Sequence, residues 1–124
     1  MKKKILIVDD EQDMLTLIEL NLIDHGYKVL KCLNGTEALN VVKQEHPDLV
    51  LLDIVLDDMD GYTVCEGIKK TNPAIKVIIY TGKMEGVNAI RARSAGSDDF
   101  VLKTHDLEYI IAAIKNLFNE PDVK

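Results

Sequence analysis

Five short apolar segments alternate with stretches that repeat apolar residues every three or four positions, and this alternation limits the possible fold most. The segments are rich in Ile, Val and Leu, as β-strands are, and they cover residues 4–8, 28–31, 49–52, 75–80 and 100–102. The first, third and fourth segments are nearly unbroken apolar runs. Such runs are typical of a parallel sheet that carries helices on both faces.

The stretches between these segments predict five helices. Gly26 ends the first and Pro47 follows the second, because glycine permits a left-handed cap and proline cannot continue a helix. The third is expected at about residues 62–70 and the fourth at about 84–95, where the apolar stripe is weakest. The fifth follows the helical period closely, at Leu107, Ile110, Ile111, Ile114, Leu117 and Phe118. Strands and helices in alternation predict an α/β fold with right-handed crossovers.

Length and composition favour one domain. The chain has 124 residues, of which 47% are apolar, enough for a single compact core. Its net charge of −6 disfavours direct binding to nucleic-acid phosphates. No apolar run is long enough to span a membrane, and the run after the basic N-terminus is too short for a secretory signal. We therefore expect a cytoplasmic location and no membrane partner.

The cysteines and histidines do not form a metal-binding pattern. Cys32 and Cys65 are far apart in the sequence and belong to no CxxC or Cys/His cluster, so free thiols are expected. His25, His46 and His105 share no spacing typical of metal ligands. We interpret all three histidines as surface or loop residues.

Polar side chains directly follow four of the five predicted strands. Asp9 and Asp10 follow the first, Asp53 the third, Thr81 the fourth and Lys103 the fifth. In an open parallel sheet, ligands bind outside the carboxyl ends of the strands. We therefore expect three carboxylates, a hydroxyl and an ammonium group to lie at one edge of the sheet.

Three carboxylates at one edge favour a bound divalent cation. Two like charges about 4 Å apart repel by roughly 4 kcal/mol at an effective dielectric constant near 20, and a dication relieves this repulsion. Oxygen ligands without nearby His or Cys favour Mg²⁺, with Mn²⁺ or Ca²⁺ as alternatives. Together with a lysine and a hydroxyl, such a cation predicts a phosphoryl-transfer site in which a carboxylate can act as the nucleophile.

Each of these residues also has a plainer structural interpretation. Asp9 and Asp10 could cap the first helix, Thr81 could belong to a turn, and Lys103 could be an ordinary residue at the end of a strand. Asp53 is harder to explain as a loop residue, because it ends a buried run. The other acids of its loop are interpreted as solvated: Asp57, Asp58 and Asp60. The convergence of the polar residues on one edge favours the functional interpretation.

Four segments resemble the receiver domain of two-component response regulators. They are ILIVDD (5–10), PDLVLLDIVLDDMDG (47–61), VIIYTG (77–82) and DDFVLK (98–103), and they span essentially the whole chain in the right order and spacing. The resemblance implies a flavodoxin-like, doubly wound parallel sheet of five strands in the order 2-1-3-4-5, with five helices. It implies a receiver domain over residues 1–120, followed by a tail or the start of a linker at 121–124.

The resemblance also implies a role for each matched residue. Asp53 would accept a phosphoryl group from a sensor histidine kinase or a phosphotransfer protein, in a reaction that requires Mg²⁺. Asp9 and Asp10 match the acidic pair that binds this metal, with Asp53 and the backbone carbonyl of Val55 as further ligands. The switch hydroxyl, the switch aromatic residue and the phosphate-pairing lysine are matched by Thr81, Phe100 and Lys103.

Phosphorylation is expected to change the surface formed by the fourth helix, the fifth strand and the last helix. That surface would then bind a downstream protein or a second copy of the chain. The domain would promote its own phosphorylation and dephosphorylation, without acting as an enzyme on outside substrates. A degenerate receiver that binds a partner without phosphorylation is the main alternative.

Two unrelated classes fit less well. A metal-dependent phosphatase with an aspartyl nucleophile resembles the pattern DxD, but Val55 occupies the position of the second acid. A flavodoxin-like FMN carrier needs a phosphate-binding loop after the first strand, where the acidic sequence DDEQD would repel phosphate.

The sequence departs from the family pattern in two places. Thr104 follows the lysine where the family usually has proline, so we predict a trans peptide bond there. Asp57 stands four residues after the acceptor, where the family usually has proline, so the family pattern does not predict the conformation of this loop. Val55 and Lys83 occupy positions that tune how fast water reaches the acyl phosphate. Because an apolar Val55 does not orient water, we expect a long-lived phosphoryl state.

Overall fold

The computed structural model describes residues 2–82, 89–103 and 107–120. Its strands are β1 (Lys4–Val8), β2 (Lys28–Cys32), β3 (Leu49–Asp53), β4 (Lys76–Thr81) and β5 (Asp99–Leu102). They form one sheet in the order β2-β1-β3-β4-β5, and all neighbouring strands are parallel. The structure therefore confirms the predicted flavodoxin-like order.

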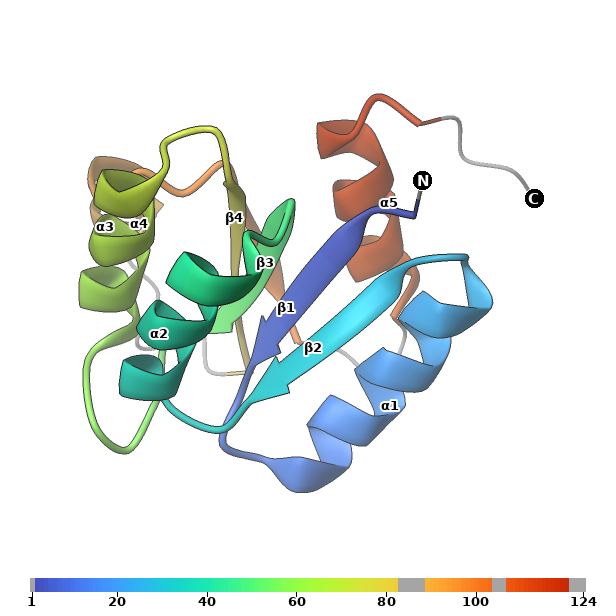
Figure 1. The fold of residues 1–124 in the computed structure, drawn as a ribbon, viewed down its shortest axis with the longest axis horizontal. Coiled ribbons are helices and arrows are strands. Elements are labelled where there is room, and N and C mark those ends of the chain that lie inside the picture. The colour runs from blue at the N-terminus through green and yellow to red at the C-terminus, as the bar shows by residue number, and fades with distance from the viewer. Residues whose placement is uncertain (1, 83–88, 104–106, 121–124) are drawn as a thin grey trace.

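Five helices connect and cover the strands. They are α1 (Gln12–Asp24), α2 (Gly35–Glu45), α3 (Gly61–Thr71), α4 (Ala89–Ser94) and α5 (Glu108–Leu117). Helices α1 and α5 lie on one face of the sheet, and α2, α3 and α4 lie on the other (Figure 1). The predicted start of the fourth helix, at residues 84–88, falls outside the described residues.

The two faces of the sheet support two separate hydrophobic cores, because successive side chains of a strand point to opposite faces. On β1, Leu6 and Val8 belong to the core under α2, α3 and α4, whereas Ile5 and Ile7 belong to the core under α1 and α5. All four side chains are fully buried. This burial explains why the strand reads as an unbroken apolar run instead of an alternating one.

The helices end near the glycine and proline residues that the sequence analysis used to predict their ends. Gly26, just after α1, has a φ of 88°, a left-handed conformation that glycine adopts without strain. Helix α2 has Asn34 as its N-cap, and the Asn34 side chain accepts a hydrogen bond from the Glu37 N–H. Its C-cap is His46, directly before Pro47. These residues mark where the two helices begin or end.

Two acids of the loop after β3, Asp58 and Asp60, form hydrogen bonds or ion pairs that the sequence analysis did not predict. Asp57 is exposed, as expected, and so is Asp58. The Asp58 carboxylate, however, accepts hydrogen bonds from the first residues of α2. The Asp60 carboxylate accepts one from the Tyr62 N–H at the start of α3 and pairs with Arg91 of α4. The loop is thus tied to three helices.

The remaining general predictions can be compared directly. Cys32 and Cys65 are free and buried, and burial raises the pKa of the Cys65 thiol to about 11. His25 and His46 are exposed at helix ends, as expected, while His105 lies outside the described residues. None of the helices in the described part of the chain combines the length and the apolar character needed to cross a membrane.

Candidate functional site

The strand ends of β1, β3, β4 and β5 bring the predicted residues together at the carboxyl edge of the sheet (Figure 1). Asp9, Asp53 and Thr81 are 0%, 3% and 1% exposed, and in the described residues they are the buried polar side chains. Burial of a carboxylate is costly unless it is paired or hydrogen-bonded. The buried carboxylates of Asp9 and Asp53 therefore need hydrogen-bond donors or positive charges nearby, and the structure contains both.

Lys103 is the central partner of the buried acids. Its Nζ lies 2.8 Å from Oδ2 of Asp53 and 3.0 Å from Oδ2 of Asp9. It also lies 3.3 Å from Oε1 of Glu11. Burial works against the charge of the ammonium group, but the hydrogen bonds to Asp53 and Asp9 outweigh it and raise the pKa of Lys103. The lysine therefore stays charged and neutralises part of the cluster.

Both oxygens of Asp53 have partners. Oδ1 accepts a hydrogen bond of 3.1 Å from the Val55 N–H, and Oδ2 accepts the bond from Lys103. Burial raises the pKa of Asp53, while the hydrogen bond from Lys103 opposes this shift and repulsion by Asp9 adds to it. Asp53 is held at the end of β3 with its carboxylate facing a positive charge.

Asp9 and Asp10 differ in their surroundings. Oδ1 of Asp9 accepts a 2.9 Å hydrogen bond from the Glu11 N–H, and its Oδ2 accepts hydrogen bonds from Lys103 and from the hydroxyl of Tyr80. Asp10 is partly exposed. Desolvation, followed by repulsion from nearby acids, raises its pKa. Neither residue caps α1, whose N-cap is Glu11 without a side-chain hydrogen bond, so the plainer interpretation as caps is wrong.

The acidic side chains fit a divalent cation that prefers oxygen ligands. Asp9, Asp10, Glu11 and Asp53 can each offer one carboxylate oxygen, and these four atoms lie within 4.8 Å of one another. A cation among them would relieve the repulsion that raises the pKa of Asp10. The donor set contains no nitrogen or sulfur, which favours Mg²⁺ over Zn²⁺.

Two residues of the site were missed by the sequence analysis. Glu11 directly follows the acidic pair, and that adjacency was a usable signal. Tyr80 lies inside the apolar run of β4, where the pattern predicts burial but carries no information about a hydroxyl. The role assigned to the Val55 carbonyl stays a prediction, although Val55 bridges Asp60 across the loop.

Thr81 and Phe100 lie on β4 and β5, the two strands next to β3 on the side away from β1. Thr81 is buried, and its backbone carbonyl accepts a 2.7 Å hydrogen bond from the Lys103 N–H, which joins the ends of β4 and β5. Phe100 lies on β5, is partly buried and packs against the core under α2, α3 and α4. Lys83 and the peptide bond before Thr104 fall outside the described residues.

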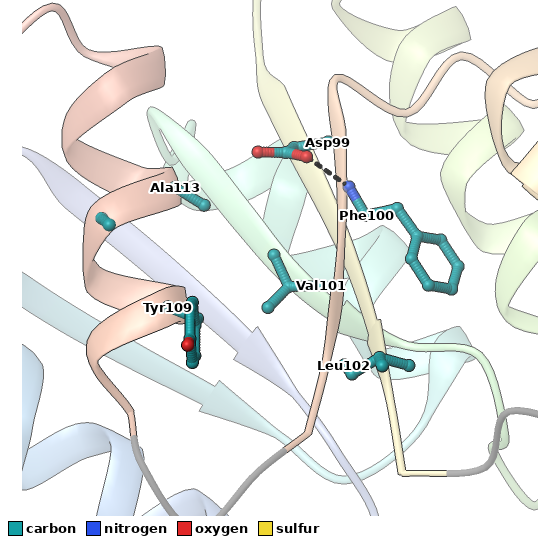
Figure 2. A pocket seen from close by; sticks show the side chains of 7 residues that line it. Asp99, Phe100, Val101, Leu102, Tyr109 and Ala113 are labelled. Atoms are coloured by element: carbon teal, nitrogen blue, oxygen red, sulfur yellow. Dashed lines mark hydrogen bonds between the residues drawn. The ribbon is translucent and has the colours of Figure 1, made fainter.

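The outer surface of β5 and α5 contains a pocket of about 540 Å³. Figure 2 shows Val101 pointing from β5 toward α5, while Phe100 points to the opposite side of the strand. Leu102 and Tyr109 line the pocket and are 36% and 66% exposed. Phe100 is among the residues that line the pocket, but its ring points away from α5, toward the core under α2, α3 and α4.

Comparison with known proteins identifies relatives over almost the full chain. The profile of the family described as response regulator receiver domain matches residues 5–115. The alkaline phosphatase synthesis transcriptional regulatory protein PhoP of Bacillus subtilis is 32% identical over 123 residues, which cover 99% of this chain and 51% of PhoP. The chain spans about half the length of the curated relatives it matches.

Solved structures agree with the fold. A CheY-like response regulator receiver domain protein from Methanospirillum hungatei has a TM-score of 0.88 and 32% identity, with 96% of both chains covered. The response regulator TrrA from Thermotoga maritima, solved in complex with Mg²⁺ and beryllium fluoride, has a TM-score of 0.86 and 30% identity, with 93% of this chain and 98% of TrrA covered.

Proposed function

This chain belongs to the response regulator receiver domain family of two-component signalling, and we propose that it accepts a phosphoryl group on Asp53. The donor would be a sensor histidine kinase or a phosphotransfer protein. The observation that carries the proposal is the placement of Asp53 beside Lys103, at 2.8 Å, within a cluster of carboxylates that can hold Mg²⁺. The complex of TrrA with Mg²⁺ and beryllium fluoride, a mimic of a phosphoryl group, supports the choice of metal.

The transfer step needs little from the protein beyond position and charge. A carboxylate oxygen of Asp53 forms a bond to phosphorus as the bond between phosphorus and the donor's imidazole nitrogen breaks, and the imidazole keeps the electron pair. When bound, Mg²⁺ supplies positive charge that stabilises the oxygens of the transferring group. Lys103 already contacts Asp53 and can pair with a phosphoryl oxygen there. The Val55 N–H keeps the acceptor carboxylate oriented.

The proposed switch begins at Thr81, whose hydroxyl moves to bond the phosphoryl group, and continues at Phe100, which turns inward. Two observations support this sequence of events. Phe100 is only partly buried, and the backbone hydrogen bond between Lys103 and Thr81 connects the two strands that carry the switch residues. The surface of α4, β5 and α5 would change as a result.

That surface is proposed to bind a downstream protein or a second copy of the chain. Ile90 on α4 is 80% exposed, and Leu102 and Tyr109 are exposed beside the pocket. A separate group of exposed apolar residues, Leu17, Leu20 and Ile23, lies on α1, the helix that follows the acidic pair. We propose α1 as the side from which the phosphoryl donor approaches.

The domain is proposed to promote its own phosphorylation and dephosphorylation in the cytoplasm and to act on no outside substrate. Val55 in place of a second acid argues against a phosphatase that turns over free phosphoesters. A degenerate receiver, which would bind its partner without phosphorylation, is less favoured because the acceptor, the lysine and the acidic cluster are all assembled at one edge.

The test is the intact mass of the protein after incubation with acetyl phosphate and Mg²⁺. We expect one added phosphoryl group on the wild-type chain and none on Asp53→Asn or after removal of Mg²⁺ by a chelator. Asp57→Asn is the matched control, because it removes an exposed acid from the same loop. If the wild-type mass stayed unchanged while Mg²⁺ still bound, the domain would be a degenerate receiver.

A further inference from the structure

Tyr80 is a fully buried tyrosine whose hydroxyl reaches the acidic cluster from the side of the sheet. It lies on β4, directly beside Asp53 in the register of the sheet, and is 0% exposed. Its ring belongs to the core under α1 and α5, and its hydroxyl donates a hydrogen bond to Oδ2 of Asp9. The chain thus places a phenol between an apolar core and a predicted metal ligand.

The hydroxyl of Tyr80 is not needed to fill the core. The core to which its ring belongs is made mainly of aliphatic side chains, among them Ile7, Leu51 and Ile78. A phenylalanine would occupy nearly the same volume and would not require a buried hydroxyl to find a partner. The partner that the hydroxyl has found is the carboxylate of Asp9, which is itself fully buried.

Three donors from three parts of the chain hold the Asp9 carboxylate. The Glu11 N–H bonds Oδ1, while Lys103 and Tyr80 both bond Oδ2. Lys103 is shared with Asp53 and would also pair with a phosphoryl group attached there. Phosphorylation of Asp53 would therefore affect the bond from Lys103 to Oδ2 of Asp9, whereas the hydrogen bond from Tyr80 to the same oxygen does not involve Asp53. The ring of Tyr80 also lies under the ammonium group of Lys103, 4.9 Å from its centroid.

We propose that Tyr80 is a positioning residue of the cation site: its hydroxyl fixes the orientation of the Asp9 carboxylate and so strengthens the binding of a divalent cation. The inference rests on the proposed function, because it assumes that the acidic cluster holds Mg²⁺. Groups that hydrogen-bond to metal ligands without touching the metal commonly change metal affinity about 10–100-fold when they are removed.

The experiment measures the dissociation constant of Mn²⁺, a paramagnetic substitute for Mg²⁺, from the electron paramagnetic resonance signal of the free ion. We expect Tyr80→Phe to raise this constant about 10-fold. The matched control is Tyr27→Phe, which also removes a phenol that donates to a carboxylate, that of Glu120, away from the cation cluster. It should leave the constant unchanged, and competition with Mg²⁺ should give the same order of affinities.

A double-mutant cycle with Asp9→Asn separates positioning from general weakening of the fold. If Tyr80 acts through Asp9, Tyr80→Phe should cause no further loss of affinity in the Asp9→Asn background. The inference would be overturned if Tyr80→Phe weakened Mn²⁺ binding equally in both backgrounds. It would also be overturned if Tyr80→Phe changed the dissociation constant of the wild-type chain by less than about two-fold, well below the usual range. If the wild-type chain bound no Mn²⁺ or Mg²⁺ at all, the proposed metal site itself would be wrong.

Discussion

The carboxylate of Asp58 accepts hydrogen bonds from both the backbone N–H and the hydroxyl of Thr36, at 2.9 and 2.7 Å. A third bond comes from the Gly35 N–H, at 2.9 Å. Because Asp58 follows the predicted phosphoacceptor by five residues, these bonds fasten the loop after Asp53 to the first turn of α2. Asn34 caps the next free N–H of the same turn, so two side chains from different loops satisfy one helix end.

The first prediction concerns this contact and pH. The hydrogen bonds from Thr36 and Gly35 lower the pKa of Asp58 from 3.8 to about 2. Its contribution to stability is therefore fully present above pH 3.8 and is lost as the pH falls toward 2. Urea unfolding should show Asp58→Asn to be less stable than wild type at pH 6, with a difference that shrinks below pH 4. Asp57→Asn, the control from the same loop, should leave the stability at pH 6 nearly unchanged, because Asp57 is exposed.

A second prediction concerns the buried ion pairs of Lys103. Lys103→Met should lower the free energy of unfolding by about 3 kcal/mol in the absence of divalent cations, because two buried carboxylates lose their positive partner. Mg²⁺ should restore more stability to the variant than to the wild type, since the cation then meets uncompensated negative charge. Urea titrations with and without Mg²⁺ measure both effects. An equal gain from Mg²⁺ in the two proteins would contradict the prediction.

The third prediction concerns Gly61, which begins α3 at the end of the same loop. A Cβ atom there would lie 2.4 Å from the Cα of Ile54 and 2.7 Å from the carbonyl oxygen of Asp53, so the backbone must move. Gly61→Ala should destabilise the fold by about 1–3 kcal/mol and slow phosphorylation of Asp53. Gly82→Ala is the control for stability, because its Cβ would meet only ordinary contacts with Lys103, at 3.7 Å and beyond. Equal unfolding energies for the two variants would refute the argument.

The fourth prediction concerns Arg91, which pairs with Asp60 and lies over the ring of Tyr62, 4.4 Å from its centroid. The Arg91 side chain is exposed in both contacts, although Tyr62 itself is buried, so Arg91→Ala should change global stability by less than about 1 kcal/mol. Amide exchange within residues 89–94 should nevertheless become faster, because α4 loses its attachment to the loop. Arg93→Ala serves as the control. Unchanged exchange in α4 would show that this contact does not hold the helix.

The fifth prediction tests the proposed switch. Beryllium fluoride with Mg²⁺ should change amide exchange in α4 and β5, at residues 89–102, more than in α2. The reason is that the proposed movements of Thr81 and Phe100 would be transmitted to the α4 and β5 side of the sheet. Mass spectrometry of exchanged peptides gives the measurement. Asp53→Asn should abolish the effect. A uniform change over all helices, or none in residues 89–102, would argue against a switch at this surface.

The sequence predicted most of the fold because the strands carry a strong signal. Unbroken apolar runs identified β1, β3 and β4, and the observed bounds differ from the predicted ones by a residue at most at either end. The edge of the sheet on which the polar residues converge followed from the parallel arrangement alone. The position of Asp53, at the end of a buried run, was informative because a buried carboxylate needs a partner.

What the sequence could not predict are contacts that depend on the path of a loop or the end of a long side chain. Asp58 was interpreted as a solvated acid because nothing in the sequence relates it to Thr36, 22 positions away. Tyr80 was assigned to a strand, but the pattern gives only the burial of its ring. Its hydroxyl meets Asp9 because β1 and β4 flank β3 in the sheet, a relation fixed by tertiary structure.

The proposed chemistry is concentrated at strand ends, while the outer faces of the helices take no part in it. Leu17 and Leu20 on α1, or Ile90 on α4, can change without touching Asp53 or Lys103. The proposed function thus assigns partner recognition and phosphoryl transfer to separate residues. An engineer could therefore redirect the domain to a new signalling circuit by rewriting a few exposed helical positions and keeping the acceptor edge as it is.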